Sequence, residues 1–188
     1  AEQMPRLLPA FHDCLRDLLK LDAVVIAAIS GHCLGGGLEL ALSCDRIIAE
    51  QNSVIGLPEI QLGCYPPAGI VQLLERRCHG QAISMVLSGS STPVDQLQRA
   101  AIVDVIADEG QLEAAVDNEI DRYCHVSPSI LAMTVRQFHR HHQRTWGQKL
   151  HDIEHDYLSE VLGHPDSHAG IEAFLSKRAP RWAGKPVS

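Results

Sequence analysis

The chain has 188 residues, 45% hydrophobic and 21% charged, which is typical of a globular protein with one sizeable core. Its formal net charge of −7 argues against a nucleic-acid-binding protein, because such proteins carry basic patches. No apolar run reaches the roughly 18 residues of a membrane span and no signal peptide opens the chain, so we expect a cytoplasmic protein without a membrane partner.

The first third of the chain predicts a helix, a strand, a glycine turn and a second helix. Apolar residues recur at helical spacing over residues 4–20. Residues 24–29 are β-branched or small and apolar, which predicts a strand buried on both faces. The triple glycine at 35–37 and the helix formers at 38–42 follow. This order places free backbone N–H groups at a helix N-terminus, facing whatever occupies the turn.

The rest of the chain alternates between short strands and helices, and then becomes helical throughout. Thr92 is expected to cap a helix that has Pro93 at its first position. The other expected elements are strands at 46–49, 53–55 and 101–106, and helices at 69–77, 81–87, 127 onward, 149–162 and 166–177. The six cysteines contain no C-x-x-C pair, so we interpret them as reduced, mostly buried thiols.

Two glutamates stand in apolar surroundings, 20 residues apart. Glu39 lies one turn into the helix after the glycines, where a carboxylate either assists the helix dipole or is held in a pocket for chemistry. Glu59 follows Pro58, whose fixed φ keeps Leu57 extended and gives the glutamate a stiff mount. Each glutamate alone fits an ordinary first-turn carboxylate. The two together with the triple glycine indicate a site.

These motifs resemble the crotonase (enoyl-CoA hydratase) superfamily along roughly the whole chain. The matching stretches are Gly35-Gly36-Gly37-Leu38-Glu39-Leu40-Ala41, Cys44-Asp45 and Pro58-Glu59-Ile60-x-Leu62-Gly63. The resemblance implies an α/β crotonase-like spiral of ββα units over residues 1–110 and a C-terminal helical trimerisation region over 111–188. Because few strands are predicted around a strand buried on both faces, we expect the N-terminal half of that fold to be missing from this chain.

The resemblance also implies a reaction, which is the addition of water to an enoyl-CoA or cyclic dienoyl-CoA thioester. Gly36 would give one of two backbone N–H groups to the thioester oxygen, Glu39 would orient or deprotonate water, and Glu59 would donate a proton. Preorganised donors stabilise the enolate charge, and two differently tuned carboxyls can divide the proton transfers. No metal or cofactor is implied beyond the coenzyme A of the substrate, and the partner is a second copy in a trimer or dimer of trimers. The residues expected to bind substrate are Cys33, Leu34, Gly35, Pro58, Tyr65, Pro66 and Lys177.

Other interpretations stay open at this stage. Gly31-His32-Cys33-Leu34-Gly35 is a cysteine form of the nucleophile elbow, which would make Cys33 the nucleophile of a thioester or ester hydrolase. An enoyl-CoA isomerase, another crotonase or a non-catalytic crotonase-fold protein are further alternatives. The sequence around Cys33-Leu34 and Pro66-Pro67 is similar to that of the cyclohexa-1,5-dienecarbonyl-CoA hydratase branch.

Two histidine motifs favour less specific interpretations. His151-x-x-Glu154-His155 matches a zinc-peptidase pattern, but it lies on a helix crowded with charge. His139, His141 and His142 stand among arginines, which predicts a solvated helix face or a subunit contact.

Overall fold

The computed structural model describes residues 3–76 and 79–183, and within them the strands form two small parallel sheets. The larger sheet has the strand order β1-β3-β5, and the smaller sheet pairs β2 with β4. Parallel pairing requires crossovers, and helices supply them. The strands are β1 (Ile26–Ile29), β2 (His32–Leu34), β3 (Arg46–Glu50), β4 (Val54–Gly56) and β5 (Val105–Ala107).

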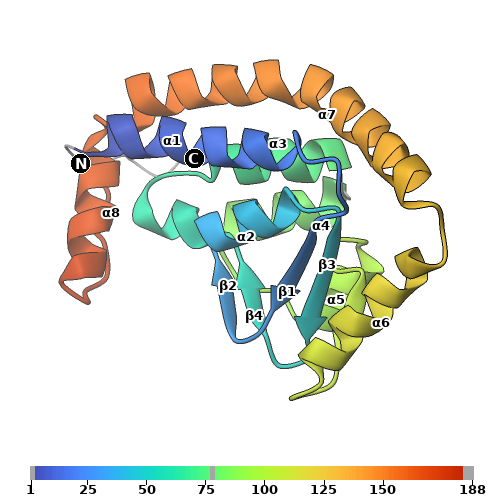
Figure 1. Ribbon diagram of the computed structural model, residues 1–188. Coiled ribbons are helices and arrows are strands. Elements are labelled where there is room, and N and C mark those ends of the chain that lie inside the picture. The colour runs from blue at the N-terminus through green and yellow to red at the C-terminus, as the bar shows by residue number, and fades with distance from the viewer. Residues whose placement is uncertain (1–2, 77–78, 184–188) are drawn as a thin grey trace.

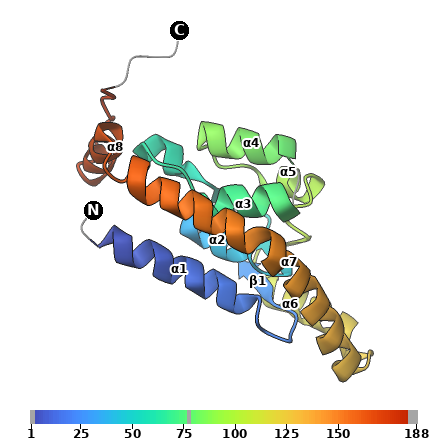
Figure 2. The ribbon, with the colours of Figure 1, turned by 90° about the horizontal axis from the view of Figure 1, so that it is seen from above.

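The helices lie mainly on one side of the strands (Figure 1). The long helix α7 crosses the top of the molecule, and Figure 2 shows it running beside α1 and α3. Within the described residues, no helix combines the length and apolar character that crossing a bilayer demands. The helices are α1 (Met4–Leu18), α2 (Gly36–Leu42), the 3₁₀ helix η1 (Pro58–Leu62), α3 (Pro67–Arg76), α4 (His79–Ser88), α5 (Val94–Arg99), α6 (Leu112–Cys124), α7 (Pro128–Asp156), the π-helical turn η2 (Tyr157–Val161) and α8 (Pro165–Leu175).

The strand that is buried on both faces is β3, not β1 as predicted. Ile47, Ile48 and Ala49 are fully buried because β3 lies between β1 and β5. In β1, Ala28 is exposed, and within the described residues this strand pairs on one side only. The β-branched run before the glycines therefore predicted a strand correctly but overstated its burial.

Several element boundaries differ from the sequence predictions for local reasons. Thr92 does not cap a helix, because α5 begins at Val94 and Pro93 occupies the N-cap position. Thr92 instead forms a bridge to β4, in which its backbone N–H donates to the Ile55 carbonyl at 2.9 Å. Ala101 has φ +54°, so the chain turns there and the last strand starts later, at Val105. The strand β2 was not predicted, and the separate polar helix at 149–162 is a continuation of α7 into η2. The expected helix end at 77 lies outside the described residues.

The cluster of His139, His141 and His142 on α7 is not the solvated face that the sequence indicated. His139 and His142 are buried, and His141 is exposed. The ring of His139 lies 2.9 Å from the Leu21 carbonyl oxygen and 2.8 Å from an Asp45 carboxylate oxygen, which ties α7 to both ends of the segment that carries β1 and α2. These polar contacts join α7 to residues that are far away in the sequence. Helical spacing alone therefore could not reveal that His139 is buried.

The predicted zinc-type motif contributes to a contact between helices, and the cysteines differ in burial. The Glu154 carboxylate pairs with the buried His12 ring of α1, so it joins α7 to α1. No three His, Cys, Asp or Glu side chains of the described residues gather as metal ligands would. The expectation of mostly buried thiols holds among the described cysteines, because Cys33, Cys44 and Cys64 are buried whereas Cys14 and Cys124 are exposed. Cys78 lies outside the described residues.

Helix α8 rests directly on η1, the turn that carries Glu59. A Cβ atom on Gly170 of α8 would lie 2.2 Å from the Leu62 carbonyl oxygen, and a Cβ on Gly63 would lie 2.5 Å from the Asp166 carbonyl oxygen. Two backbones meet there without side chains between them, which glycine alone permits. The C-terminal helices thus help to fix the position of Glu59.

Candidate active site

The glycine turn before α2 presents an unpaired backbone N–H. Gly35 has φ +56° and ψ −128°, and its own N–H donates to the Gly56 carbonyl at 3.0 Å, which anchors the turn to β4. Gly36, the first residue of α2, is exposed. Among the described residues, no group accepts a hydrogen bond from the Gly36 N–H. This amide is available to an oxygen from outside the chain, as the sequence predicted for a helix N-terminus.

Glu39 is a buried carboxyl that two backbone amides hold. Its side chain is 4% exposed, and Oε1 accepts a hydrogen bond from the Gly69 N–H at 2.7 Å. Burial raises the pKa of Glu39 to about 7, the Gly69 and Ala68 amides oppose that rise, and the charge of Glu59 adds to it. A carboxyl with a pKa near 7 can gain and lose a proton at neutral pH, as a general base must.

Glu59 is the second residue of η1 and has one oxygen without a partner. Its Oε2 is buried, and among the described residues no donor or acceptor pairs with it. Burial raises the pKa of Glu59 as well. Because an unpaired buried oxygen is costly, this atom is poised for a group that the chain itself does not supply.

The two carboxyl groups converge on the adjacent glycines Gly35 and Gly36. A Cβ atom on Gly35 would lie 2.9 Å from Glu59 Oε1, and a Cβ on Gly36 would lie 3.9 Å from Glu39 Oε2. The same position on Gly36 would lie 3.6 Å from the ring of Phe11, which α1 brings over the turn. Two carboxyls of raised pKa, a free amide and an aromatic ring are therefore gathered at the turn that Gly35 and Gly36 form.

The remaining predicted site residues differ in position and in exposure. Pro58 begins η1, Tyr65 is half-buried, and Pro66 is buried just before α3. Leu34 is exposed at the end of β2. Lys177 is exposed past the end of α8, and it is not among the groups that act on either carboxyl. Its predicted contact with coenzyme A phosphates stays a prediction.

Cys33 is buried in β2, where its chemistry does not suit a nucleophile. Burial raises the pKa of this thiol to about 11. Reactive cysteines have a lowered pKa, because the thiolate is the attacking species. The environment of Cys33 therefore disfavours the hydrolase interpretation of the glycine turn.

Two aromatic residues join the carboxyls without a signal in the sequence. Phe11 belongs to the apolar face of α1, and that pattern could have indicated burial but not proximity to Gly36. Tyr157 begins η2 and lies near both carboxyls, whose charges raise its pKa further after burial has raised it. Tyr157 and Glu59 are about 100 residues apart in the sequence, so no local pattern could indicate that they lie close together.

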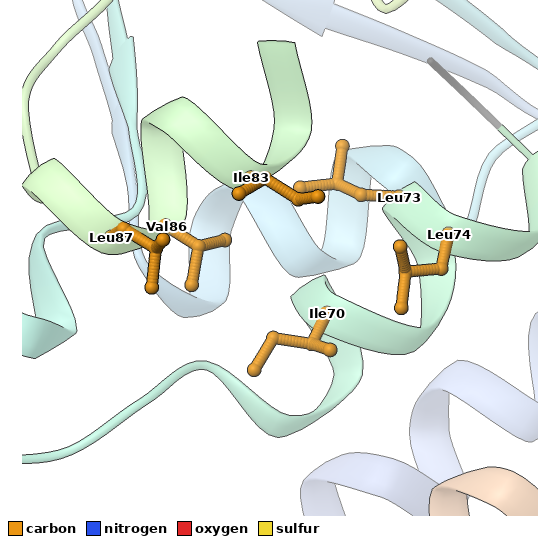
Figure 3. Close-up of a pocket in the computed structure, with 6 residues that line it drawn as sticks. All are labelled: Ile70, Leu73, Leu74, Ile83, Val86 and Leu87. Atoms are coloured by element: carbon orange, nitrogen blue, oxygen red, sulfur yellow. The ribbon is translucent and has the colours of Figure 1, made fainter. Parts of the chain in front are cut away.

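A groove between α3 and α4 is separate from the carboxyl pair. It encloses about 180 Å³, and its lining presents no polar surface (Figure 3). The groove starts at Ile70, the residue after Gly69, and contains none of the predicted site residues. Its lining residues are Ile70, Leu73, Leu74, Ile83, Val86 and Leu87.

The raised pKa of Glu39 predicts that stability falls as pH rises. Between the unfolded value of 4.5 and the folded value of about 7, the folded chain holds a proton that the unfolded chain releases. The free energy of unfolding should therefore decrease across this window by on the order of 3 kcal/mol and then level off. Glu39→Gln keeps an oxygen for the Gly69 N–H and should remove the part of the decrease that Glu39 causes, while the raised pKa of Glu59 leaves its own part. Urea unfolding at pH 5 and pH 8 would measure the difference. An equal decrease in both proteins would contradict a buried, protonated Glu39.

The fold and the paired carboxyls define a class that comparison with known proteins also finds. A family model described as enoyl-CoA hydratase/isomerase matches residues 3–185, so the chain belongs to this family. The predicted crotonase membership is thereby confirmed. The crystal structure of an enoyl-CoA hydratase from Mycobacterium avium subsp. paratuberculosis K-10 aligns with a TM-score of 0.86 at 24% identity, covering 96% of this chain and 74% of the other. This likeness supports the crotonase-like fold.

Two curated relatives indicate the range of related proteins. A cyclohexa-1,5-dienecarbonyl-CoA hydratase of Thauera aromatica is 31% identical over 186 residues, which covers 98% of this chain and 71% of the relative. A 2,3-dehydroadipyl-CoA hydratase of Escherichia coli K12 is 39% identical over 163 residues, which covers 86% of this chain and 63% of the relative. The chain thus spans about two thirds of the length of these relatives.

Proposed function

We propose that the protein is a hydratase that adds water to the conjugated double bond of a 2-enoyl-CoA or cyclic dienoyl-CoA thioester. The observation that carries the proposal is the convergence of the Glu39 and Glu59 carboxyls on Gly35 and Gly36. The unpaired Gly36 N–H and the unpaired Glu59 Oε2 support it, because each lacks a partner that a bound thioester and water could supply.

In the proposed reaction, the Gly36 N–H donates to the thioester oxygen as negative charge develops there. Glu39 accepts a proton from water, whose oxygen forms the new bond to Cβ. Glu59 gives its proton to Cα as the enolate collapses, so the double bond is consumed and one proton has moved from Glu59 to Glu39. A return of that proton through solvent restores both groups. An oxyanion donor of this kind typically contributes on the order of 10²–10³ in rate.

The acyl group is the less determined part of the proposal. The two curated relatives are named for different acyl groups, one cyclic and one carrying a second carboxyl. We therefore propose the enoyl-CoA class, with a cyclic dienoyl thioester as the first candidate. Phe11 is an aromatic wall beside Gly36 and supports a planar acyl group.

A panel of straight-chain and cyclic enoyl-CoA thioesters tests the proposal. Hydration is followed by loss of absorbance from the conjugated thioester and by mass analysis of the product. A product heavier by one water supports a hydratase. A product of unchanged mass with a moved double bond would indicate an isomerase, and free coenzyme A that disappears in Cys33→Ser would indicate a hydrolase. No reaction with any thioester would contradict the proposal.

A further inference from the structure

The C-terminal helical layer brings one buried hydroxyl close to the two carboxyls. Tyr157 is the first residue of the π-helical turn η2, where α7 departs from regular α-helical geometry. Its side chain is only 7% exposed. Turns of this kind are rare and often occur at functional sites, because the wider turn redirects a side chain.

Contacts link Tyr157 to the backbone that carries Glu59. Tyr157 packs with Cys64 and Leu8 in one buried cluster, and its ring meets that of Tyr65 edge to face, with centroids 5.3 Å apart and planes at 89°. The Cys64 thiol in turn donates to the Glu59 carbonyl oxygen at 3.3 Å. The hydroxyl thus interacts with a thiol that itself holds the Glu59 turn.

The surroundings keep this hydroxyl protonated at neutral pH. Burial raises the pKa of Tyr157, and the neighbouring Cys64, Glu59 and Glu39 raise it further. Tyr65 is a further titratable group in contact with the Tyr157 ring, and α1 contributes the apolar Leu8. A neutral hydroxyl in this place can donate a hydrogen bond to the Cys64 thiol.

We propose that Tyr157 is a positioning residue for the hydration reaction, and that it acts on Glu59 through Cys64. This inference rests on the proposed function. When Glu59 gives its proton to Cα, a carboxylate remains in a buried place, and the dipoles of the Tyr157 hydroxyl and the Cys64 thiol lower the cost of that charge. Tyr157 keeps its own proton throughout, so the proton balance of the reaction is unchanged.

The test removes one hydroxyl and compares it with a matched one. Tyr157→Phe retains the ring and its packing. Tyr123→Phe removes the hydroxyl of a half-buried phenol on α6, which donates to a Glu119 carboxylate oxygen at 2.8 Å. The charged groups that act on Tyr123 are Glu119, Arg46 and Arg122, not the site pair. Tyr123→Phe is therefore the control for the loss of a half-buried phenol hydroxyl outside the proposed site.

The expected result is a change in kcat and in its pH dependence. Tyr157→Phe should lower kcat about 10-fold while KM changes by less than about 2-fold, because the proton transfer and not binding is affected. The loss of a donor raises the pKa of Glu59. The alkaline limb of the kcat profile should therefore shift to higher pH by about half a unit or more. Tyr123→Phe should leave the kcat profile unchanged.

The outcomes separate this inference from the proposed function. Hydration by the wild-type protein with identical kcat profiles for Tyr157→Phe and Tyr123→Phe would overturn the role of Tyr157 alone. Absence of hydration by the wild-type protein would overturn both. Thermal melting checks folding, and if Tyr157→Phe does not fold, Cys64→Ala breaks the same link from the other side. An unmoved alkaline limb in Cys64→Ala would then overturn the inference.

Discussion

Glu59→Gln is expected to lower the rate of enoyl-CoA hydration by about 10²–10⁴-fold, the range that a general acid contributes. Glutamine has the size of the carboxyl and cannot deliver its proton, so substrate binding should change far less than kcat. The buried Oε2 of Glu59 has no partner among the described residues, and the replacement therefore breaks no hydrogen bond of that atom. Stopped assays of the purified variant against the wild-type protein would measure the loss.

Glu39→Gln should show a loss of similar size, because the amide cannot accept a proton from water. Its Oε1 still accepts from the Gly69 N–H, so the start of α3 should stay in place. Glu113→Gln is the matched control, since Glu113 lies exposed in the first turn of α6. A rate within a few-fold of wild type for either site variant would remove that carboxyl from the mechanism.

The local part of the site could be predicted from the sequence, because one short strand-turn-helix segment and one proline-mounted turn determine it. Gly36 at the start of α2 and Glu39 one turn later follow from residue preferences over a few positions. Glu59 after Pro58 follows in the same way, although the expected loop is a 3₁₀ helix. The roles of these residues stay proposals, while their proximity is a property of the fold.

The non-local part could not be predicted, because it depends on which helices meet. His139 is buried against acceptors at Leu21 and Asp45, which are roughly 100 residues away in the sequence. Its charged neighbours on α7 therefore gave no indication that this position is buried. The approach of Tyr157 to Glu59 has the same origin. Periodicity identifies which face of a helix is apolar, but not which element covers it.

Gly35→Ala is expected to abolish most hydration activity. The backbone of Gly35 has φ +56° and ψ −128°, a region in which an L side chain is strained by on the order of 1–3 kcal/mol. The added methyl would also lie 2.9 Å from Glu59 Oε1, so the carboxyl must move away from the site or the turn must open. Either response separates Glu59 from Gly36, and misplacing a catalytic group by about 1 Å can cost about 10²-fold in rate.

Gly31→Ala distinguishes backbone strain from displacement of the carboxyl. Gly31 also has a positive φ, +73°, but a Cβ there would meet no atom within 4 Å. Both variants should therefore lose stability in denaturant unfolding, each by on the order of 1–3 kcal/mol. Only Gly35→Ala should lose hydration under conditions where both are folded. If the two variants lose activity equally, strain in the glycine turn and not the position of Glu59 controls the reaction. If both retain activity, the close approach of Glu59 to Gly35 is irrelevant to catalysis.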